Sequence, residues 1–241
     1  MNQVIEQLRE RKSMRVFTDR VITPEEKKAI LEAATQAPTA GNQQLYTIID
    51  VTDQQMKEQL VHTCDNQPFI AQAKMVLIFC ADCRKWYNAF LAAGCQPRKP
   101  GVGDLLLAVS DTNIAAQNAV TAAHSLGIGS CYIGDVMENA ERHREILNLP
   151  EYVFPAAMLV FGYPTDQQLA RPKPQRTGME HIVHENGYRD MDREELEKMF
   201  SSNAGSRPYD EWIQAFCNRK YNSDFSREMT RSVRAYLEDY L

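Results

Sequence analysis

The 241-residue chain has no apolar run long enough to cross a bilayer and no apolar block at its start. Its longest apolar stretches, Met75 to Ala81 and Ala156 to Gly162, fall far short of the ~20 residues that a spanning helix needs. Residues 1–13 are already amphipathic and charged, unlike a secretory signal. These absences predict a cytoplasmic protein without a membrane partner.

An excess of positive charge is also lacking. The chain carries 27 Lys and Arg residues against 32 Asp and Glu residues, which gives a net charge of −5 at pH 7. A protein that binds nucleic acid regardless of sequence needs a basic face that displaces counterions from phosphates. We therefore expect no nucleic-acid partner, although a local basic pocket for a small anion is compatible with this balance.

Recognisable metal and nucleophile motifs are absent as well. Six cysteines are scattered, and the close pair Cys80 and Cys83 has no second pair or histidines at the spacing of a zinc site. We expect reduced, structural thiols and no bound metal. The chain contains no G-x-S-x-G, H-E-x-x-H or G-x-G-x-x-G motif. The glycines at 101–103 and 127–129 lack the flanking strand and helix of a dinucleotide turn.

The apolar patterns that are present predict helices alternating with about four strands. Thr23-Pro24-Glu25-Glu26 is a strong helix start, because Thr caps, Pro fits the first turn and acidic side chains favour the positive end of the dipole. The predicted strands are 47–52, 75–81, 131–136 and 156–164, and the predicted helices are 4–11, 24–36, 54–63, 111–127, 139–147, 192–200, 209–221 and 226–241.

The last third of the chain differs in character. Residues 167–176 are Pro-rich and basic and predict an extended surface loop, while residues 201–206 are small and polar and predict a mobile link. The helical stretches carry aromatic residues without a core of their own, so they must pack on the main domain or on a partner subunit. These residues are Tyr209, Trp212, Phe216, Tyr221, Phe225, Tyr236 and Tyr240.

Three segments could hold an anionic ligand. They are Arg11 to Arg15, Ala37 to Gln43 and Arg171 to Arg176. Arginine offers a planar fork for phosphate oxygens and lysine a point charge. Each segment also has a plain structural interpretation: the first is a solvated helix end whose cations satisfy the dipole, the second an ordinary loop, and the third a basic loop kept in solvent. Residue chemistry alone leaves both interpretations open.

These segments belong to a series of motifs by which the chain resembles the nitroreductase family, in particular the oxygen-insensitive nitroreductases and the NADPH-flavin oxidoreductases. The resemblance covers nearly the whole chain, and several motifs in one order are more specific than any single one. They are ERKSMRVFTDRVIT at 10–23, AATQAPTAGNQQ at 33–44, QPFIAQA at 67–73, VLIFCAD at 76–82, DTNIAAQNAVTAAHSLGIGSCYIGDV at 111–136, KPQR at 173–176 and IVHEN at 182–186.

The resemblance implies an α+β fold, in which a mixed four- to five-stranded sheet is flanked by helices and two chains form an intertwined homodimer. It places an FMN-binding nitroreductase domain at residues 1–190. Residues 191–241 would then form a helical C-terminal extension that packs on the partner subunit. Such an extension accounts for aromatic helices that have no core of their own.

The resemblance also implies where FMN binds at the dimer interface. The cofactor-binding residues would be Arg11, Lys12, Ser13 and Arg15 at the phosphate and ribityl chain, Lys173 and Arg176 from the later loop, Thr39, Ala40 and Asn42 on the partner subunit's side, Gln67 and Phe69 at the phosphate and pyrimidine end, and Tyr132, Ile133 and Gly134 along the isoalloxazine. Arg11 stands where close relatives often carry His, and an extra residue separates Lys173 from Arg176.

The implied activity is ping-pong oxidoreduction, in which NADPH or NADH passes hydride to FMN and a small acceptor then takes it up. The acceptors would be nitroaromatics, quinones or free flavin, and no catalytic side chain is needed. Arg207 is the arginine nearest to the position where NADPH-preferring relatives bind the nicotinamide nucleotide. An FMN carrier or sensor without reductase turnover is the alternative function.

Overall fold

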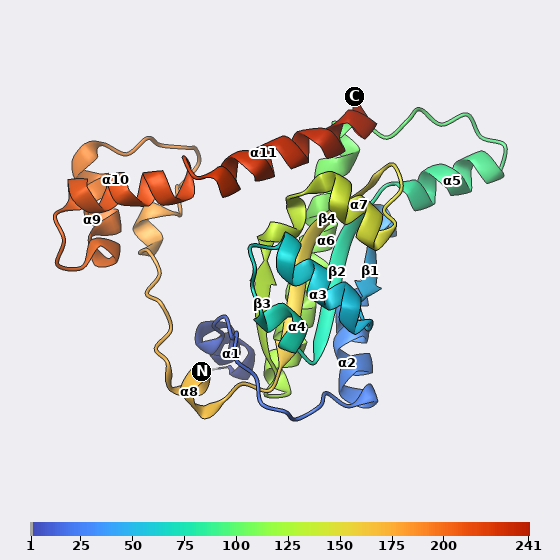
Figure 1. The fold of residues 1–241 in the computed structure, drawn as a ribbon. Helices are drawn as coiled ribbons and strands as arrows, with labels where there is room; N and C mark the ends of the chain where they lie inside the picture. Colours follow the sequence, from blue (N-terminus) through green and yellow to red (C-terminus); the bar gives the residue numbers. More distant parts are fainter. Residues whose placement is uncertain (1) are drawn as a thin grey trace. The chain divides into compact units, whose positions relative to one another are not determined.

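The computed structural model describes residues 2–241, and these divide into two compact units. The first unit contains residues 2–171 together with 228–241, and the second is Pro172–Arg227. The first unit holds the sheet and most of the helices (Figure 1). No helix within residues 2–241 has the length and hydropathy that crossing a bilayer requires.

A four-stranded sheet in the order β1-β2-β4-β3 forms the centre of the first unit. Its strands are β1 Tyr46–Asp50, β2 Met75–Asp82, β3 Gly129–Ile133 and β4 Val153–Gly162. All three pairs are antiparallel, so the parallel component expected of a mixed sheet is reduced to one bridge between Ser13 and Ser130. The two central strands β2 and β4 are buried along their whole length, which explains their uninterrupted apolar sequences.

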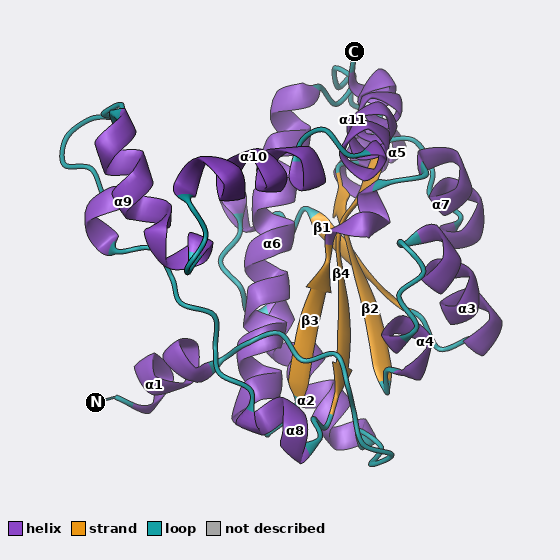
Figure 2. Ribbon diagram, turned by 60° about the vertical axis from the view of Figure 1, so that its left-hand side comes forward, coloured by secondary structure: helices purple, strands orange, loops and turns teal. Residues whose placement is uncertain are grey.

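Helices cover both faces of this sheet (Figure 2). On one face α2 (Pro24–Thr35) and α6 (Val102–Ser125) pack through small and apolar side chains, including Ile30, Ala119 and Val120. On the other face lie α3 (Gln54–Thr63), α4 (Phe69–Gln72) and α7 (Ala140–Leu147). The α2 start is the predicted one, since Thr23 and Glu26 form a reciprocal capping box.

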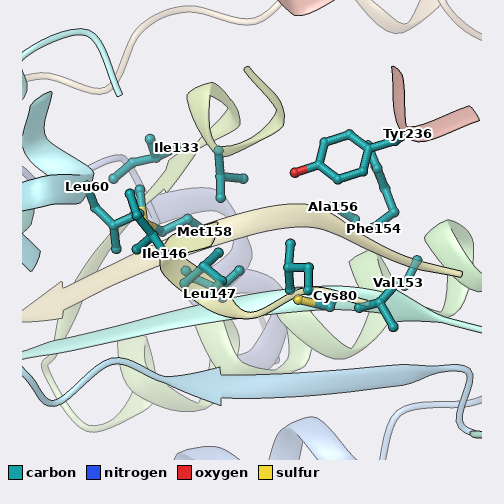
Figure 3. Close-up of a cluster of buried hydrophobic side chains, with 14 of the residues drawn as sticks. Leu60, Cys80, Ile133, Ile146, Leu147, Val153, Phe154, Ala156, Met158 and Tyr236 are labelled. Atoms are coloured by element: carbon teal, nitrogen blue, oxygen red, sulfur yellow. The ribbon is translucent and has the colours of Figure 1, made fainter. Parts of the chain in front are cut away.

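The end of the chain closes the second face. Helix α11 (Asp224–Leu237) and the short turn η4 (Glu238–Tyr240) bring Tyr236 and Tyr240 into the core, as the close-up of the buried cluster shows for Tyr236 beside Phe154 (Figure 3). The Tyr236 hydroxyl donates to the carbonyl oxygen of Ala140 at 3.3 Å. Two of the aromatic residues left without a core by the sequence pattern therefore pack on the main domain of their own chain.

Several element boundaries differ from the sequence prediction. Helix α6 begins at Val102 rather than near Asp111, and an unpredicted helix α5 (Arg84–Ala92) precedes it. The expected extended loop at 167–176 starts with a short helix, α8 (Asp166–Ala170), capped by Thr165. The remaining elements are α1 (Gln3–Glu10), η1 (Ala40–Asn42), η2 (Gly134–Met137), η3 (Met179–His181), α9 (Arg193–Ala204) and α10 (Tyr209–Lys220).

Candidate functional site

The first basic segment is fixed against the edge strand β3. The Met14 amide donates to the carbonyl oxygen of Ser130 at 2.9 Å, and the Met14 side chain is buried. This contact is close because Gly129 has no side chain: a Cβ there would lie 2.7 Å from Met14 Cγ. Segment Ser13 to Arg15 is therefore positioned by the sheet rather than hanging as a free helix end.

The chain following β4 holds the same segment from its other side. Lys12 Nζ donates to the carbonyl oxygen of Leu169 at 2.7 Å and also to that of Arg171. The Arg171 guanidinium donates back to the carbonyl oxygen of Ser13. Gln168 Oε1 accepts from the Arg15 amide at 3.2 Å. Gln168 was not among the predicted site residues, because an amide beside a helix start has no distinctive pattern.

A cavity of about 80 Å³ lies where this segment meets the start of β3. Its lining includes Arg11, Lys12, Gly129 and Ser130. Within residues 2–241 the Arg11 Nη1 atom is buried and has no hydrogen-bond partner. A buried charged donor that is left unpaired costs ~1–3 kcal/mol or more, so a ligand oxygen that reached Nη1 would relieve that cost. Arginine beside a cavity of this size suits a phosphate group.

Phe69 and Cys131 both lie close to the arginines of this segment. The Arg15 guanidinium lies 5.9 Å from the centre of the Phe69 ring, which brings α4 to the basic segment. Burial raises the pKa of the Cys131 thiol, and the charges of Arg15 and Arg11 act against that rise. Gln67 lies beside Phe69, and its side-chain amide donates to the carbonyl oxygen of Cys64 at 2.9 Å.

Strand β3 leads away from the cavity toward the other predicted site residues. Tyr132 and Ile133 end the strand, and Gly134 begins η2. Gly134 lies four positions after Ser130, which is about 13 Å along an extended strand. Burial raises the pKa of Tyr132 to about 12, and the charge of Arg11 opposes this rise. Because β3 ends the order of strands, the part of its outer edge beyond the bridge at Ser130 can offer backbone N–H and C=O groups to a ligand.

The second predicted segment lies elsewhere on the first unit. Ala40 and Asn42 lie in the turn η1, and Thr39 directly precedes it. Thr39 and Ala40 donate hydrogen bonds to the Asp111 carboxylate in α6. The cavity at the start of β3 is lined by His124, also in the range of α6. His124 lies thirteen positions after Asp111, which is about 20 Å along a helix. The turn therefore does not lie at the cavity of its own chain.

Lys173, Arg176 and Arg207 belong to the second unit. Lys173 and Arg176 lie in the extended stretch between α8 and η3, and Arg176 is exposed. Arg207 follows α9, and its amide donates to the carbonyl oxygen of Ala204 at 3.2 Å. The small residues Ser201 to Ala204 continue α9 and do not form a link. Of the link expected at 201–206, only residues 205 and 206 lie outside this helix.

The covered sheet defines an α+β protein, and Arg11 lies in the lining of a cavity at the edge of that sheet. Comparison with known proteins makes this specific. The nitroreductase family model matches residues 8–163. The chain belongs to the nitroreductase family, as the sequence motifs predicted.

Individual relatives match over nearly their full length. An FMN reductase [NAD(P)H] from Bacillus subtilis is 33% identical over 99% of this chain and 92% of its own. An oxygen-insensitive NADPH nitroreductase from Salmonella typhimurium is 33% identical over 100% and 97%. Among solved structures, an NADPH:FMN oxidoreductase from Vibrio harveyi complexed with NAD+ superimposes with a TM-score of 0.84, at 26% identity over 98% of both chains. The α+β fold is thus confirmed.

Proposed function

We propose that this protein is an FMN-dependent NAD(P)H oxidoreductase that reduces small-molecule acceptors such as nitroaromatics, quinones or free flavin. The observation that carries the proposal is Arg11 in the lining of the cavity at the start of β3, with its Nη1 atom unpaired within residues 2–241. The full-length similarity to an FMN reductase and to an NADPH nitroreductase supports the same activity.

The residues of this chain would bind and orient the cofactor. Arg11, with Ser13 and Arg15 beside it, would hold the phosphate and ribityl chain. Two carbonyl oxygens already accept from Lys12, so it would act as a nearby positive charge as well as a brace for the segment. FMN, when bound, supplies the capacity to accept hydride from a nicotinamide and to deliver it to an acceptor. The edge of β3 at Tyr132 to Gly134 would present backbone groups to the ring.

Contributions from the second unit belong to the same proposal. Lys173 and Arg176 would close on the phosphate side, and Arg207 would bind the nicotinamide nucleotide. Gln67 and Phe69 would lie at the phosphate and pyrimidine end, where Phe69 already meets Arg15. Each of these roles follows the residue types and the family resemblance.

The site would be completed by a homodimer. The turn with Thr39, Ala40 and Asn42 lies about 20 Å along α6 from the cavity of its own chain, so it would meet the FMN of the partner subunit. Apolar side chains on α5 and α6 are exposed in the isolated chain, among them Phe90, Leu107 and Ile114, and a partner would cover them.

The proposed dimer also implies a domain organisation along the chain. Residues 1–190 would form the FMN-binding domain, and the helical extension at 191–241 would pack on the partner while α11 anchors its end to its own chain. We also propose a cytoplasmic location and no nucleic-acid or membrane partner. All six cysteines are free thiols, which suits a reducing compartment.

An anaerobic absorbance titration tests the function. Purified protein is saturated with FMN, freed of excess cofactor and scanned before and after addition of NADPH or NADH. Bleaching of the flavin bands, followed by their return on adding a quinone, is the expected result. Protein that takes up no FMN would refute the proposal, whereas bound FMN that neither nucleotide bleaches would favour a carrier or sensor.

A matched pair of variants tests the site. Arg11→Ala should lose FMN on dialysis, because the phosphate loses a charge-assisted hydrogen bond. Arg142→Ala is the control, since this exposed arginine pairs with Glu145 on α7 and lies outside the cavity. Equal retention of flavin absorbance by both variants would remove Arg11 from the site.

A further inference from the structure

Asp111 is a buried carboxylate in α6 that none of the cofactor contacts above uses. It is only 3% exposed, and its neighbours on the buried side of α6 are small or apolar, such as Ala108 and Ala115. Burying an ionised carboxylate is strongly unfavourable unless hydrogen bonds compensate for the lost water. A helix selected for packing alone would carry an apolar side chain here.

The hydrogen bonds that the described residues make to this carboxylate come from one short segment, Thr39–Leu45. The Thr39 hydroxyl donates to Oδ2, and the Ala40 amide donates to Oδ1 at 3.1 Å. The Leu45 amide donates to Oδ2 at 3.4 Å. Asp111 thus holds both ends of the segment, and Thr39 Oγ1 extends the network by accepting from the Gln44 amide at 2.8 Å.

The segment that Asp111 holds has an unfavourable backbone. Gly41, Asn42 and Gln44 all adopt left-handed conformations, with φ of 55°, 55° and 51°. Non-glycine residues keep such angles only where the surroundings fix them, which occurs often at ligand-binding turns. Helix α5 adds a second brace, because Trp86 Nε1 donates to the carbonyl oxygen of Gln43 at 2.8 Å.

We infer that Asp111 is a positioning residue for the cofactor: it fixes the Thr39–Leu45 segment in the shape in which this segment would contact FMN bound by the partner subunit. The inference rests on the proposed dimeric FMN site. Asp111 itself touches no cofactor, since its oxygens are occupied by the segment. Its role is to keep Thr39, Ala40 and Asn42 in place before FMN arrives, so that binding does not have to order them.

Asp111→Asn tests the inference with little change in volume. Asparagine has one acceptor oxygen where aspartate has two, and its amide group would face a backbone N–H of the segment. We expect the FMN dissociation constant to rise on the order of tenfold, with a shifted FMN midpoint potential. Hydrogen exchange at the Ala40 and Leu45 amides should quicken in the FMN-free dimer. Asp104→Asn, on the same helix and paired with Arg98, should leave all three unchanged.

A second substitution keeps the test decisive if Asp111→Asn fails to fold. Thr39→Val removes the hydroxyl that links Asp111 to the Gln44 amide, and Thr39→Ser keeps it. Valine should weaken FMN binding and serine should restore it. In the double variant with Asp111→Asn, the valine effect should largely disappear, because both changes break one network.

Three outcomes are distinguishable. Weaker FMN binding and a shifted potential in Asp111→Asn, but not in Asp104→Asn, support the inference. Unchanged affinity and potential despite faster exchange would overturn it while leaving the proposed function intact, since Asp111 would then be structural only. Wild-type protein that binds no FMN would overturn both.

Discussion

Gly129 shows how one missing side chain positions the basic segment. A Cβ at this position would lie 2.7 Å from Met14 Cγ and 2.8 Å from Met14 Cβ, so Gly129→Ala must push Ser13 to Arg15 away from β3. We expect a loss of about 1–3 kcal/mol in the free energy of unfolding, as for other overpacked cores. FMN affinity should fall as well. Urea denaturation and flavin fluorescence titration measure the two effects.

Gly103→Ala is the matched control for this prediction. Gly103 lies in the first turns of α6, and a Cβ there would have nothing within 4 Å. Alanine is favoured over glycine in a helix by up to about 1 kcal/mol, so this variant should be as stable as the wild type or more so. If Gly129→Ala behaved like Gly103→Ala, the contact with Met14 would not hold the segment.

Glu138 makes stability depend on pH. Its side chain is buried and Oε1 has no hydrogen-bond partner within residues 2–241. Burial raises the pKa of Glu138 to about 7, with the charges of Asp135, Asp65 and Glu228 adding to the rise. The folded state therefore holds this proton more tightly than the unfolded chain. The associated stability is present at low pH and is lost as pH rises through about 7.

Glu138→Gln should remove this loss. The variant should melt at a higher temperature than the wild type at pH 8, whereas the two should be similar at pH 5, where the wild-type carboxyl is protonated. Burial lowers the pKa of His143, which gives a slope of the opposite sign, but that group is present in both proteins. Thermal denaturation across this pH range decides, and parallel curves for the two proteins would contradict the prediction.

Individual residues were predictable where a local rule acts. The capping pair Thr23 and Glu26 needs only its own turn, so sequence was sufficient to place it. The cluster at Arg11 was visible as charge, but its hydrogen bonds to residues 168–171 depend on contacts more than 150 positions away. Asp111 was not predicted as a functional residue, because the expected helix began there and an acidic residue is ordinary at a helix start.

At the scale of elements, α11 is the helix that attaches the end of the chain to the first unit. Tyr236 is 1% exposed and packs edge-on against Phe154 with ring centres 5.1 Å apart. Arg231 forms a salt bridge with Glu141 at 2.7 Å, and Arg144 forms one with Asp239 at 2.6 Å. The Arg231–Glu141 pair is exposed and should contribute little, so the buried Tyr236 ring should contribute more to stability than this pair does.

Tyr236→Ala should destabilise the fold by about 3–5 kcal/mol, the usual cost of removing a buried aromatic ring. Tyr221→Ala serves as the control, since Tyr221 is 78% exposed and its loss should change stability by less than about 0.5 kcal/mol. Both values follow from denaturant titrations of the FMN-free protein. Similar midpoints for the two variants would show that α11 is not part of the cooperative core.

The missed elements have different physical causes. In α5, Trp86, Phe90 and Leu91 have the spacing of an apolar helix face, but the fold of the single chain leaves them partly exposed. The glycines at 101–103 were expected to lack a following helix, but Gly101 directly precedes α6. The Asp104 carboxylate, in the first turn of α6, accepts from the Gly101 amide at 2.8 Å and so supports the start of the helix.

At the scale of the whole molecule, the exposed apolar residues of α6 predict association. Leu107 and Ile114 are 44% and 41% exposed and lie seven residues apart, on one stripe of the helix. Replacing both by Asp should yield monomers that bind FMN weakly, because the partner would no longer supply its turn. Val21→Asp, at a residue 69% exposed outside this stripe, should remain dimeric. Sedimentation velocity measures the mass, and a dimer of the double variant would exclude this face.

The separation between the cavity and the Asp111-held turn along α6 has a genetic consequence. If each flavin is held by the cavity of one subunit and the turn of the other, an Arg11→Ala allele and an Asp111→Asn allele damage different halves. Mixed dimers then contain one intact site and one doubly damaged site, so random pairing should restore about a quarter of wild-type activity. Two alleles that are each impaired alone would thus support better growth together, a form of intragenic complementation open to selection in cells that depend on this reductase.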